Sequence, residues 1–262
     1  MRFDYENRIV AYVDILGFKN VVDASPKNAE ASERIHNALK RIHRIVEKNY
    51  SKGIANGTEF GIEVSTFSDN AVISYPAEKD NLFFLIIELI HLQLDLVIEG
   101  VLIRGGITIG DLYHDKDVVY GPAMVQAYEM ENKIAVYPRI VVDEKAIVSY
   151  IEGIHGDTDA VKEIFALLRQ DSDGLFFVDI LNQSQEIYPE KRYYEWLTRI
   201  RAIIIEGLSN PNLYIRVKYQ WLRNYFNKIV NNANYNYPYP YDGYYNIDDL
   251  KRVYSALFIE LI

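Results

Sequence analysis

The chain has no cysteine among its 262 residues, which excludes disulfides, thiolate metal sites and cysteine nucleophiles and suits a reducing compartment. Positive charge is also in short supply, because 28 Lys and Arg face 37 Asp and Glu and the net charge is -9. A protein that coats nucleic acid needs an excess of phosphate-neutralising cations. We therefore expect no nucleic-acid polymer as a partner, whereas a nucleoside triphosphate needs only a few basic groups and a metal ion.

The sequence also lacks a long apolar run without polar interruption. Residues 1–7 carry Asp4 and Glu6 ahead of a short apolar stretch, which is not typical of a signal peptide. The most lipid-like segment, residues 82–98, has polar residues at helical spacing, namely Glu88, His91, Asp95 and, just beyond it, Glu99. This pattern predicts a buried amphipathic helix, no membrane insertion and a cytoplasmic location.

Hydrophobic periodicity predicts an α+β fold. The chain is long enough, and at 49% hydrophobic residues apolar enough, to bury one large core or a core with an appendage. The expected elements are a strand at 9–15, a helix after Ser25-Pro26, a hairpin around Asp69, a helix at 82–99 and a strand at 101–109. This β-α-β-β-α-β order predicts a ferredoxin-like sheet with its helices on one face.

A change of pattern near residue 148 predicts a second region. A helix near Pro122 and a strand at 139–142 complete the expected core domain, residues 1–148. Residues 149–262 contain a further candidate strand at 175–180 and are otherwise dominated by long helical patterns, so we expect a mainly helical extension. Residues 231–246, rich in Tyr, Asn and Pro, predict an ordered loop or aromatic contact patch; stacking on bases is the alternative.

Asp14 is the residue that most needs an explanation. It lies inside an apolar strand pattern that ends in Leu16-Gly17-Phe18, and a carboxylate in such a run is costly to bury. The alternatives are a solvent-facing strand residue or a helix cap. Asp69 lies at the tip of the expected hairpin, where its alternative is an ordinary turn aspartate. If the two aspartates meet at one strand end, they can hold divalent metal ions.

Two glycine-containing segments follow later in the chain. Arg104 precedes Gly105-Gly106, and glycines in a strand let the backbone approach another group closely. Tyr120-Gly121-Pro122 predicts a turn that opens a helix. Each signal is weak alone, since bulges and tight packing also use glycine.

Taken in order, these segments resemble the class III nucleotidyl cyclases, the family of adenylyl and guanylyl cyclase catalytic domains. The resemblance covers residues 9–142 and rests on four strings, YVDILGFK (12–19), FSDN (67–70), RGGITIG (104–110) and YGPAMVQAYEME (120–131). It implies that Asp14 and Asp69 bind metal and that Arg104 helps to hold a triphosphate. The same strings look like the Pycsar pyrimidine cyclases, bacterial anti-phage enzymes that make cyclic UMP or cyclic CMP.

The departures from the purine cyclases concern base reading and charge neutralisation. Ser65 stands where that family places a base-reading lysine, and Val118 where it places an acidic or comparable polar reader. Val125 and Glu129 stand in place of its transition-state asparagine and arginine. Either the domain is an inactive cyclase that binds or scaffolds, or it is a divergent cyclase with another base preference. The retained Asp14, Asp69 and Arg104 favour the second interpretation.

The resemblance thus implies a phosphorus-oxygen lyase that converts UTP or CTP to the 3′,5′-cyclic monophosphate and pyrophosphate. Two Mg²⁺ or Mn²⁺ ions would be held by Asp14, Asp69 and the Ile15 carbonyl, the N–H groups of Leu16, Gly17 and Phe18 would cradle phosphate, and Arg104 would bind the triphosphate. Lys19 is a weaker phosphate candidate, and Arg139 is a guess for the missing transition-state cation. The resemblance also implies a head-to-tail homodimer whose product acts on a separate effector protein.

Three alternatives remain at this point. The first is a purine cyclase with altered base contacts, which a panel of triphosphates would reveal. The second is a non-catalytic nucleotide-binding or interaction module, which would tolerate loss of Asp14 and Asp69. Third, polymerase palms and diguanylate cyclases also use two metal ions on a similar sheet. The acidic composition argues against a polymerase palm, and the lack of a Gly-Gly-Asp/Glu-Glu-Phe string argues against a diguanylate cyclase.

Overall fold

The computed structural model describes residues 4–55, 61–78, 80–187, 190–231 and 254–260. The chain divides into two compact units, residues 1–180 and 181–262. The boundary expected at 148/149 stays a prediction about domain organisation. The tyrosine-rich segment 231–246 lies outside the described residues except for Asn231.

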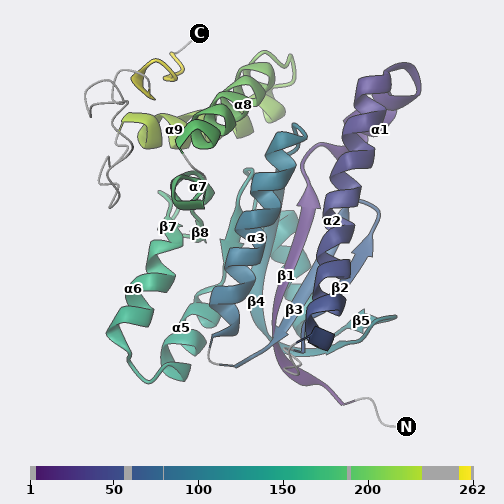
Figure 1. The fold of residues 1–262 in the computed structure, drawn as a ribbon, viewed down its shortest axis with the longest axis vertical. Helices are drawn as coiled ribbons and strands as arrows, with labels where there is room; N and C mark the ends of the chain where they lie inside the picture. Colours follow the sequence, from purple (N-terminus) through teal and green to yellow (C-terminus); the bar gives the residue numbers. More distant parts are fainter. Residues whose placement is uncertain (1–3, 56–60, 79, 188–189, 232–253, 261–262) are drawn as a thin grey trace. The chain divides into compact units, whose positions relative to one another are not determined.

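The first unit is built on a mixed sheet (Figure 1), whose strand order is β2-β3-β1-β4-β6-β8-β7, with β5 paired to β4. The strands are β1 (Glu6–Ile15), β2 (Glu63–Phe67), β3 (Asn70–Pro76), β4 (Ile103–His114), β5 (Val119–Tyr120), β6 (Ile140–Val142), β7 (Leu168–Gln170) and β8 (Phe176–Val178). The β4–β6 pair is parallel and the other pairs are antiparallel. β1 therefore occupies the interior of the sheet, between β3 and β4.

The predicted ferredoxin-like order is confirmed. β1, α2 (Ala29–Ala55), β2, β3, α3 (Asn81–Ile98) and β4 follow one another, and the four strands lie in the order β2-β3-β1-β4. The sequence pattern did not predict α1 (Phe18–Ala24), a short helix that begins directly after Gly17. A 3-10 turn, Ser25–Lys27, connects α1 to α2.

α3 is a core helix. By length and composition it is the one helix in the described ranges that could cross a membrane, with a mean hydropathy of 1.9, but 61% of that window is buried inside the structure. It packs on β3 and β1 and is flanked by α2 and α5 (Glu144–Gly153). The expectation of a buried helix is confirmed by this packing.

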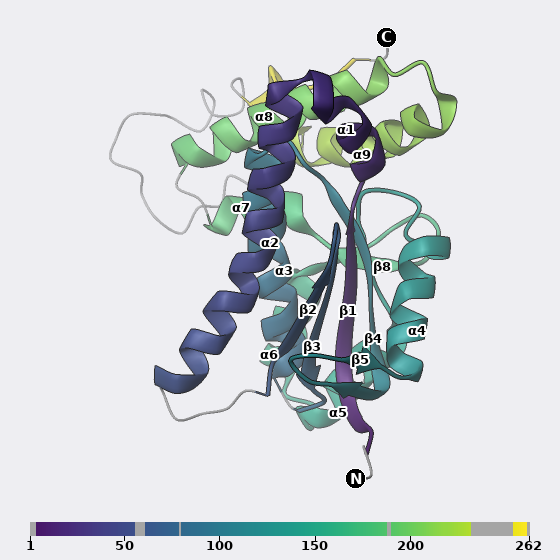
Figure 2. The same ribbon diagram turned by 90° about the vertical axis from the view of Figure 1, so that its right-hand side faces the viewer.

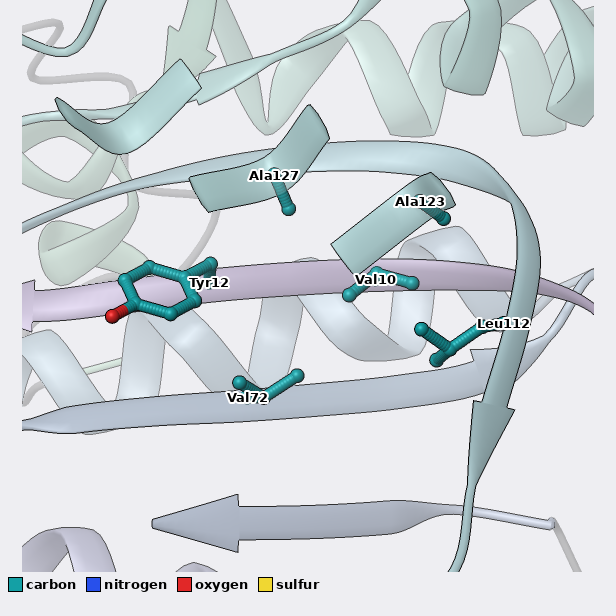
Figure 3. Packing of buried hydrophobic residues seen from close by; sticks show 6 residues of the cluster. All are labelled: Val10, Tyr12, Val72, Leu112, Ala123 and Ala127. Carbon is teal, nitrogen blue, oxygen red and sulfur yellow. The ribbon is translucent and has the colours of Figure 1, made fainter. Parts of the chain in front are cut away.

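The opposite face of the sheet is covered by α4 (Pro122–Glu129), so the helices of the unit do not all lie on one face (Figure 2). The two crossover helices, α2 and α3, do share a face as predicted. Residues of β1, β3 and β4 pack under two alanines of α4 (Figure 3); this cluster comprises Val10, Tyr12, Val72, Leu112, Ala123 and Ala127. Because side chains alternate along a strand, Asp14 belongs to the same face as Val10 and Tyr12.

The glycine pair of β4, Gly105-Gly106, lets the helical segment that begins with α4 pack closely on this face of the sheet. A Cβ at Gly106 would lie 2.5 Å from the Cβ of Met130 and 2.9 Å from the carbonyl oxygen of Ala127. α4 continues through a π-helical turn, η2 (Met130–Ile134), which rests on this glycine. Such a turn inside an α-helix is uncommon and is found at functional sites.

The remaining elements are mainly helical. α6 (Thr158–Ala166) precedes the β7–β8 hairpin in the first unit, and α7 (Ile180–Ile187) begins at the unit boundary. The second unit contains α8 (Glu190–Leu208) and α9 (Leu213–Asn231), which pack against each other. The predicted helical C-terminal region is therefore confirmed, while β7 and β8 extend the sheet.

Gly106→Ala should destabilise the protein by about 1–3 kcal/mol, because the added methyl group overlaps the backbone and Cβ of the α4–η2 segment. Gly110→Ala is the matched control on the same strand, since its Cβ would lie 3.6 Å from Ala123, an ordinary contact. Urea unfolding of both variants measures the difference. Equal unfolding free energies for the two variants would contradict the close packing at Gly106.

Candidate active site

Asp14 lies near the C-terminal end of β1 on the face covered by α4. In the sheet register it pairs with Asn70 of β3 on one side and with Arg104 of β4 on the other. The side chain is only 17% exposed, so the strand holds a carboxylate that is largely removed from water. The alternative of a solvent-facing strand residue does not fit this burial.

The β2–β3 turn brings Asp69 to Asp14. The turn has two residues, Ser68 and Asp69, and Ser68 has a φ of 59°, a left-handed conformation that is uncommon for residues other than glycine. The N–H of Ile15 donates to the Asp69 carbonyl oxygen at 3.3 Å, which ties the turn to the end of β1. The two carboxyl groups then lie close enough for a side-chain hydrogen bond. The predicted meeting of these aspartates is therefore present in the structure.

Arg104 is held between two carboxylates. Its Nη2 lies 2.6 Å from Glu131 Oε1 and 3.5 Å from Asp14 Oδ2, and its Nη1 donates to the Glu131 carbonyl oxygen at 3.4 Å. The Nε–H of Arg104 is buried and has no hydrogen-bond partner among the described residues. A buried donor without a partner costs stability, so a ligand oxygen at this position would satisfy it.

Glu131 is the site residue that the sequence reasoning missed. It lies in the π-helical turn and is buried, with a side chain only 4% exposed. The available signal was the Met130-Glu131 pair at the end of the fourth motif. A glutamate that is buried next to apolar residues needs a cationic partner. Its position is fixed by the contact of Met130 with Gly106.

The electrostatic balance of the cluster is negative. Burial, together with the charges of Glu131 and Asp69 and the hydrogen bond that protonated Asp14 donates to Asp69, raises the pKa of Asp14 from 3.8 to about 7, while Arg104 acts in the opposite direction. The same burial and the carboxylates of Glu131 and Asp14 raise the pKa of Tyr12 to about 12. Three carboxylates facing one guanidinium are short of positive charge, and either a proton or a cation relieves the repulsion.

A divalent cation fits the Asp14–Asp69 pair. Their oxygens are the hard ligands that Mg²⁺ and Mn²⁺ prefer, and a bound cation would offset the repulsion from Glu131 and Asp69 that, after burial, raises the pKa of Asp14. The fit is limited to this pair: in the described part of the chain, no group of three or more His, Cys, Asp or Glu side chains is arranged around one metal position. Main-chain, water or substrate oxygens would complete the coordination.

The loop after β1 only partly matches the predicted phosphate cradle. The N–H of Leu16 already donates to the Leu102 carbonyl oxygen at 2.8 Å, so it is not available to a phosphate oxygen. Gly17, with a φ of 78°, and Phe18 begin α1, and nothing lies within 4 Å of a Cβ built on Gly17. The cradle therefore reduces to these two amides. Lys19 is exposed and forms an ion pair with Asp23 one helical turn away, as expected for a surface lysine.

Arg139 is not a candidate catalytic cation. Its side chain is 1% exposed, it forms ion pairs with Asp171 and Asp173 in the β7–β8 hairpin, and its guanidinium lies over the ring of Tyr137. These contacts make it a structural residue of the sheet edge, which corrects the guess made from sequence. Val125 and Glu129 lie exposed on α4, and Glu129 pairs with Lys133.

No protein-family model and no curated protein matches the chain. Among solved structures, it is similar to the guanylate cyclase domain of RhGC from Catenaria anguillulae in complex with GTP, with 16% identity, a TM-score of 0.42, and 67% of this chain and 97% of that chain covered. A second is the monomeric guanylyl cyclase domain of the RhoGC fusion protein from the aquatic fungus Blastocladiella emersonii, with 14% identity, a TM-score of 0.41, and coverage of 67% and 95%.

A third is the catalytic core of a rhodopsin-guanylyl cyclase with converted specificity in complex with ATPalphaS, with 15% identity, a TM-score of 0.39, and coverage of 67% and 96%. Identities and TM-scores this low do not carry a functional argument. The function is therefore inferred from the residues of the site.

Asp14→Asn should stabilise the metal-free protein in a pH-dependent manner. Because the pKa of Asp14 is about 7 in the folded protein and 3.8 ordinarily, the folded state binds more protons between these values, and the parent loses stability as the pH rises through them. Asparagine removes this loss. Its advantage should grow by about 2 kcal/mol from about pH 5 to about pH 8, measured by urea unfolding in EDTA.

Asp159→Asn serves as the control, because Asp159 is an exposed carboxylate of α6 that pairs with Lys162. Its unfolding free energy should follow that of the parent protein across the same pH range. An advantage of Asp14→Asn that is the same at pH 5 and pH 8 would show that Asp14 is not the group whose pKa is raised.

Proposed function

We propose that the protein is a nucleotidyl cyclase that converts UTP or CTP to the 3′,5′-cyclic monophosphate and pyrophosphate. The observation that carries this proposal is the meeting of Asp14 and Asp69 beside Arg104, whose buried Nε–H has no partner among the described residues. A carboxylate pair for divalent cations next to an arginine donor suits a metal-bound triphosphate. The motifs in the sequence narrow this chemistry to cyclisation.

Asp14, Asp69 and the carbonyl of Ile15 would hold two Mg²⁺ or Mn²⁺ ions, which supply Lewis acidity at the ribose 3′-hydroxyl and at the leaving pyrophosphate. The 3′-oxygen attacks the α-phosphorus, the bond to pyrophosphate breaks, and the hydroxyl proton passes to solvent. Gly17 and Phe18 offer their amides at the open start of α1 to phosphate oxygens.

Arg104 binds the triphosphate in this proposal. In the ligand-free structure its guanidinium is shared between Asp14 and Glu131. Asp14 would attract Arg104 less strongly if it held a cation, whereas Glu131, 2.6 Å from Arg104 Nη2, would still hold the guanidinium at the site. Arg104 then presents its Nε–H to a phosphate oxygen as a charge-assisted donor.

The choice of pyrimidine substrates rests on the sequence. Ser65 and Val118 replace the residues with which purine cyclases read the base, and the four motif strings look like those of the Pycsar enzymes. In that role the product would be a second messenger in anti-phage defence that acts on a separate effector. A purine cyclase and a non-catalytic nucleotide-binding module are the alternative functions.

A head-to-tail homodimer is part of the proposal. Large apolar side chains are exposed on α4 (Val125 and Tyr128), on the β5 segment before it (Val118 and Tyr120) and beside the β2–β3 turn (Phe67). Exposed apolar side chains of this size can contribute to an association surface. If two chains pair head to tail through this surface, residues of both chains would line each active site. The partner chain would then complete the site.

The purified protein should produce cyclic UMP or cyclic CMP when incubated with Mn²⁺ or Mg²⁺ and each of the four nucleoside triphosphates, with products identified by mass. Asp14→Ala and Asp69→Ala should each lower the rate by roughly 100-fold or more, the scale of losing a preorganised electrostatic contact. Asp159→Ala, at an exposed carboxylate far along the chain, should leave it unchanged. Cyclic AMP or cyclic GMP as the only product would favour the purine alternative, and no product from any triphosphate would favour the binding module.

Val125→Arg should convert the dimer to monomers and lower activity, because it places a charge in the centre of the proposed association surface. Val125 is 58% exposed on α4. Val148→Arg is the matched control: Val148 is 52% exposed on α5, which packs on the other face of the sheet. Sedimentation velocity measures the oligomeric state. A monomeric parent protein with full activity would contradict the proposed assembly.

A further inference from the structure

A buried polar cluster on the Asp14 face has no role in the chemistry described above. It contains Arg8 of β1, Ser74 of β3 and His114 at the end of β4, all of which are buried. β4 curves over this face of the sheet (Figure 3), and the ring of His114 reaches both β3 and the outer strand β2. The fourth member is Ser65 of β2, which is only partly buried.

The hydrogen bonds of this cluster run in one direction. Arg8 Nε–H can only donate, and it donates to Ser74 Oγ at 2.9 Å. Ser74 Oγ also lies 2.8 Å from His114 Nδ1. Ser74 is fully buried, so its hydroxyl hydrogen needs an acceptor. Among the described residues that acceptor is His114 Nδ1, and Ser74 therefore donates to Nδ1.

This bond fixes the tautomer of His114. Burial and the nearby charge of Arg8 lower the pKa of His114 to about 4, so the ring is neutral near pH 7 and carries one N–H. With Nδ1 accepting, that hydrogen is on Nε2, which lies 3.0 Å from Ser65 Oγ and donates to it. The hydroxyl hydrogen of Ser65 is then directed away from His114. Ser65 has no other hydrogen-bond partner among the described residues, and it is partly exposed.

Ser65 faces the region next to the candidate active site. The register places Ser65, Val72 and Tyr12 in one row across the sheet, and Phe67, Asn70 and Asp14 in the next row on that face. Ser65 is thus two strands away and two residues along from Asp14, roughly 10 Å across and about 7 Å along the strands. A nucleotide whose phosphates lie at Asp14 can extend its base over such a distance, within one chain or across the proposed dimer.

We propose that Ser65, oriented by the Arg8–Ser74–His114 chain, donates a hydrogen bond to a carbonyl oxygen of the substrate base and thereby selects UTP over CTP. This inference rests on the proposed function and narrows its substrate. The 4-position of uracil carries an acceptor oxygen, whereas that of cytosine carries a donor amino group. A serine hydroxyl whose oxygen already accepts from His114 pairs better with the acceptor. Ser65 is then a specificity residue, and His114 a positioning residue.

The test compares kcat/KM for UTP and CTP in the parent protein and in Ser65→Ala. Loss of the hydroxyl should lower the ratio of the UTP value to the CTP value by about tenfold, the scale of one lost hydrogen bond. Ser65→Thr keeps a hydroxyl and should keep the ratio. Thr66→Val is the matched control, because Thr66 is the next residue of β2, its side chain points to the other face, and its hydroxyl lies 3.5 Å from His43 Nδ1.

A second measurement does not depend on activity. The ¹⁵N chemical shifts of labelled histidine report the tautomer, and the resonance absent from His114→Gln identifies His114. The Nε2–H form is expected, and the Nδ1–H form would overturn the inference. A parent protein that makes no cyclic nucleotide would overturn the proposed function and this inference together. A parent that makes cyclic UMP, with an unchanged UTP-to-CTP ratio in Ser65→Ala, would overturn the inference alone.

Discussion

The ion pairs of Arg104 join the three elements on which the site depends. One guanidinium reaches Asp14 of β1 and Glu131 of the turn after α4, from its own position on β4. Burying two carboxylates near each other is unfavourable unless a cation lies between them. The guanidinium therefore sets how closely the α4–η2 segment approaches the sheet, and Gly106 removes the side chain that would prevent that approach. The close packing at Gly106 and the ion pairs of Arg104 therefore both hold Asp14, Arg104 and Glu131 together.

The remaining charge imbalance defines what the site can bind. One guanidinium does not neutralise the three carboxylates Asp14, Asp69 and Glu131, and burial together with the other two carboxylates raises the pKa of Asp14 despite Arg104. A cation at the aspartate pair and an anion at the buried Nε–H of Arg104, which has no partner within the described ranges, satisfy different parts of this arrangement. A metal-bound triphosphate supplies both at once, which is why the site suits such a ligand better than a metal ion or a phosphate alone.

Much of the core was predictable from sequence because its signals are local. The apolar run in residues 9–15, the polar stripe at 82–98 and the turn residues around Asp69 each specify an element without reference to the rest of the chain. The meeting of Asp14 and Asp69 was a conditional expectation, and the pairing of β1 with β3 places Asp14 opposite Asn70, the neighbour of Asp69. Glu131 was not predictable in the same way, since its role arises from a π-helical turn that packs on a glycine 25 positions earlier in the chain.

Two other outcomes depended on contacts that a sequence does not display. The Leu16 amide is taken by Leu102 because the loop after β1 continues the ladder with β4 for one more bond. Arg139 is occupied by Asp171 and Asp173, which reach it only because β7 and β8 extend the sheet on the far side of β6. In both cases long-range pairing, not local propensity, decided whether a polar group remained available.

The alternation of β1 constrains how this strand can evolve. Its odd-numbered residues from Ile9 to Ile15 are buried in the core on the α3 side, while Tyr12 packs under α4 (Figure 3) and Asp14, two residues further on, belongs to the same face. Inserting or deleting a single residue within the strand would exchange the side chains of its two faces. A carboxylate would then enter the apolar core, and aliphatic side chains would point towards the site. This strand can therefore accept substitutions but not insertions or deletions. An alignment of relatives should contain no gap between Ile9 and Asp14.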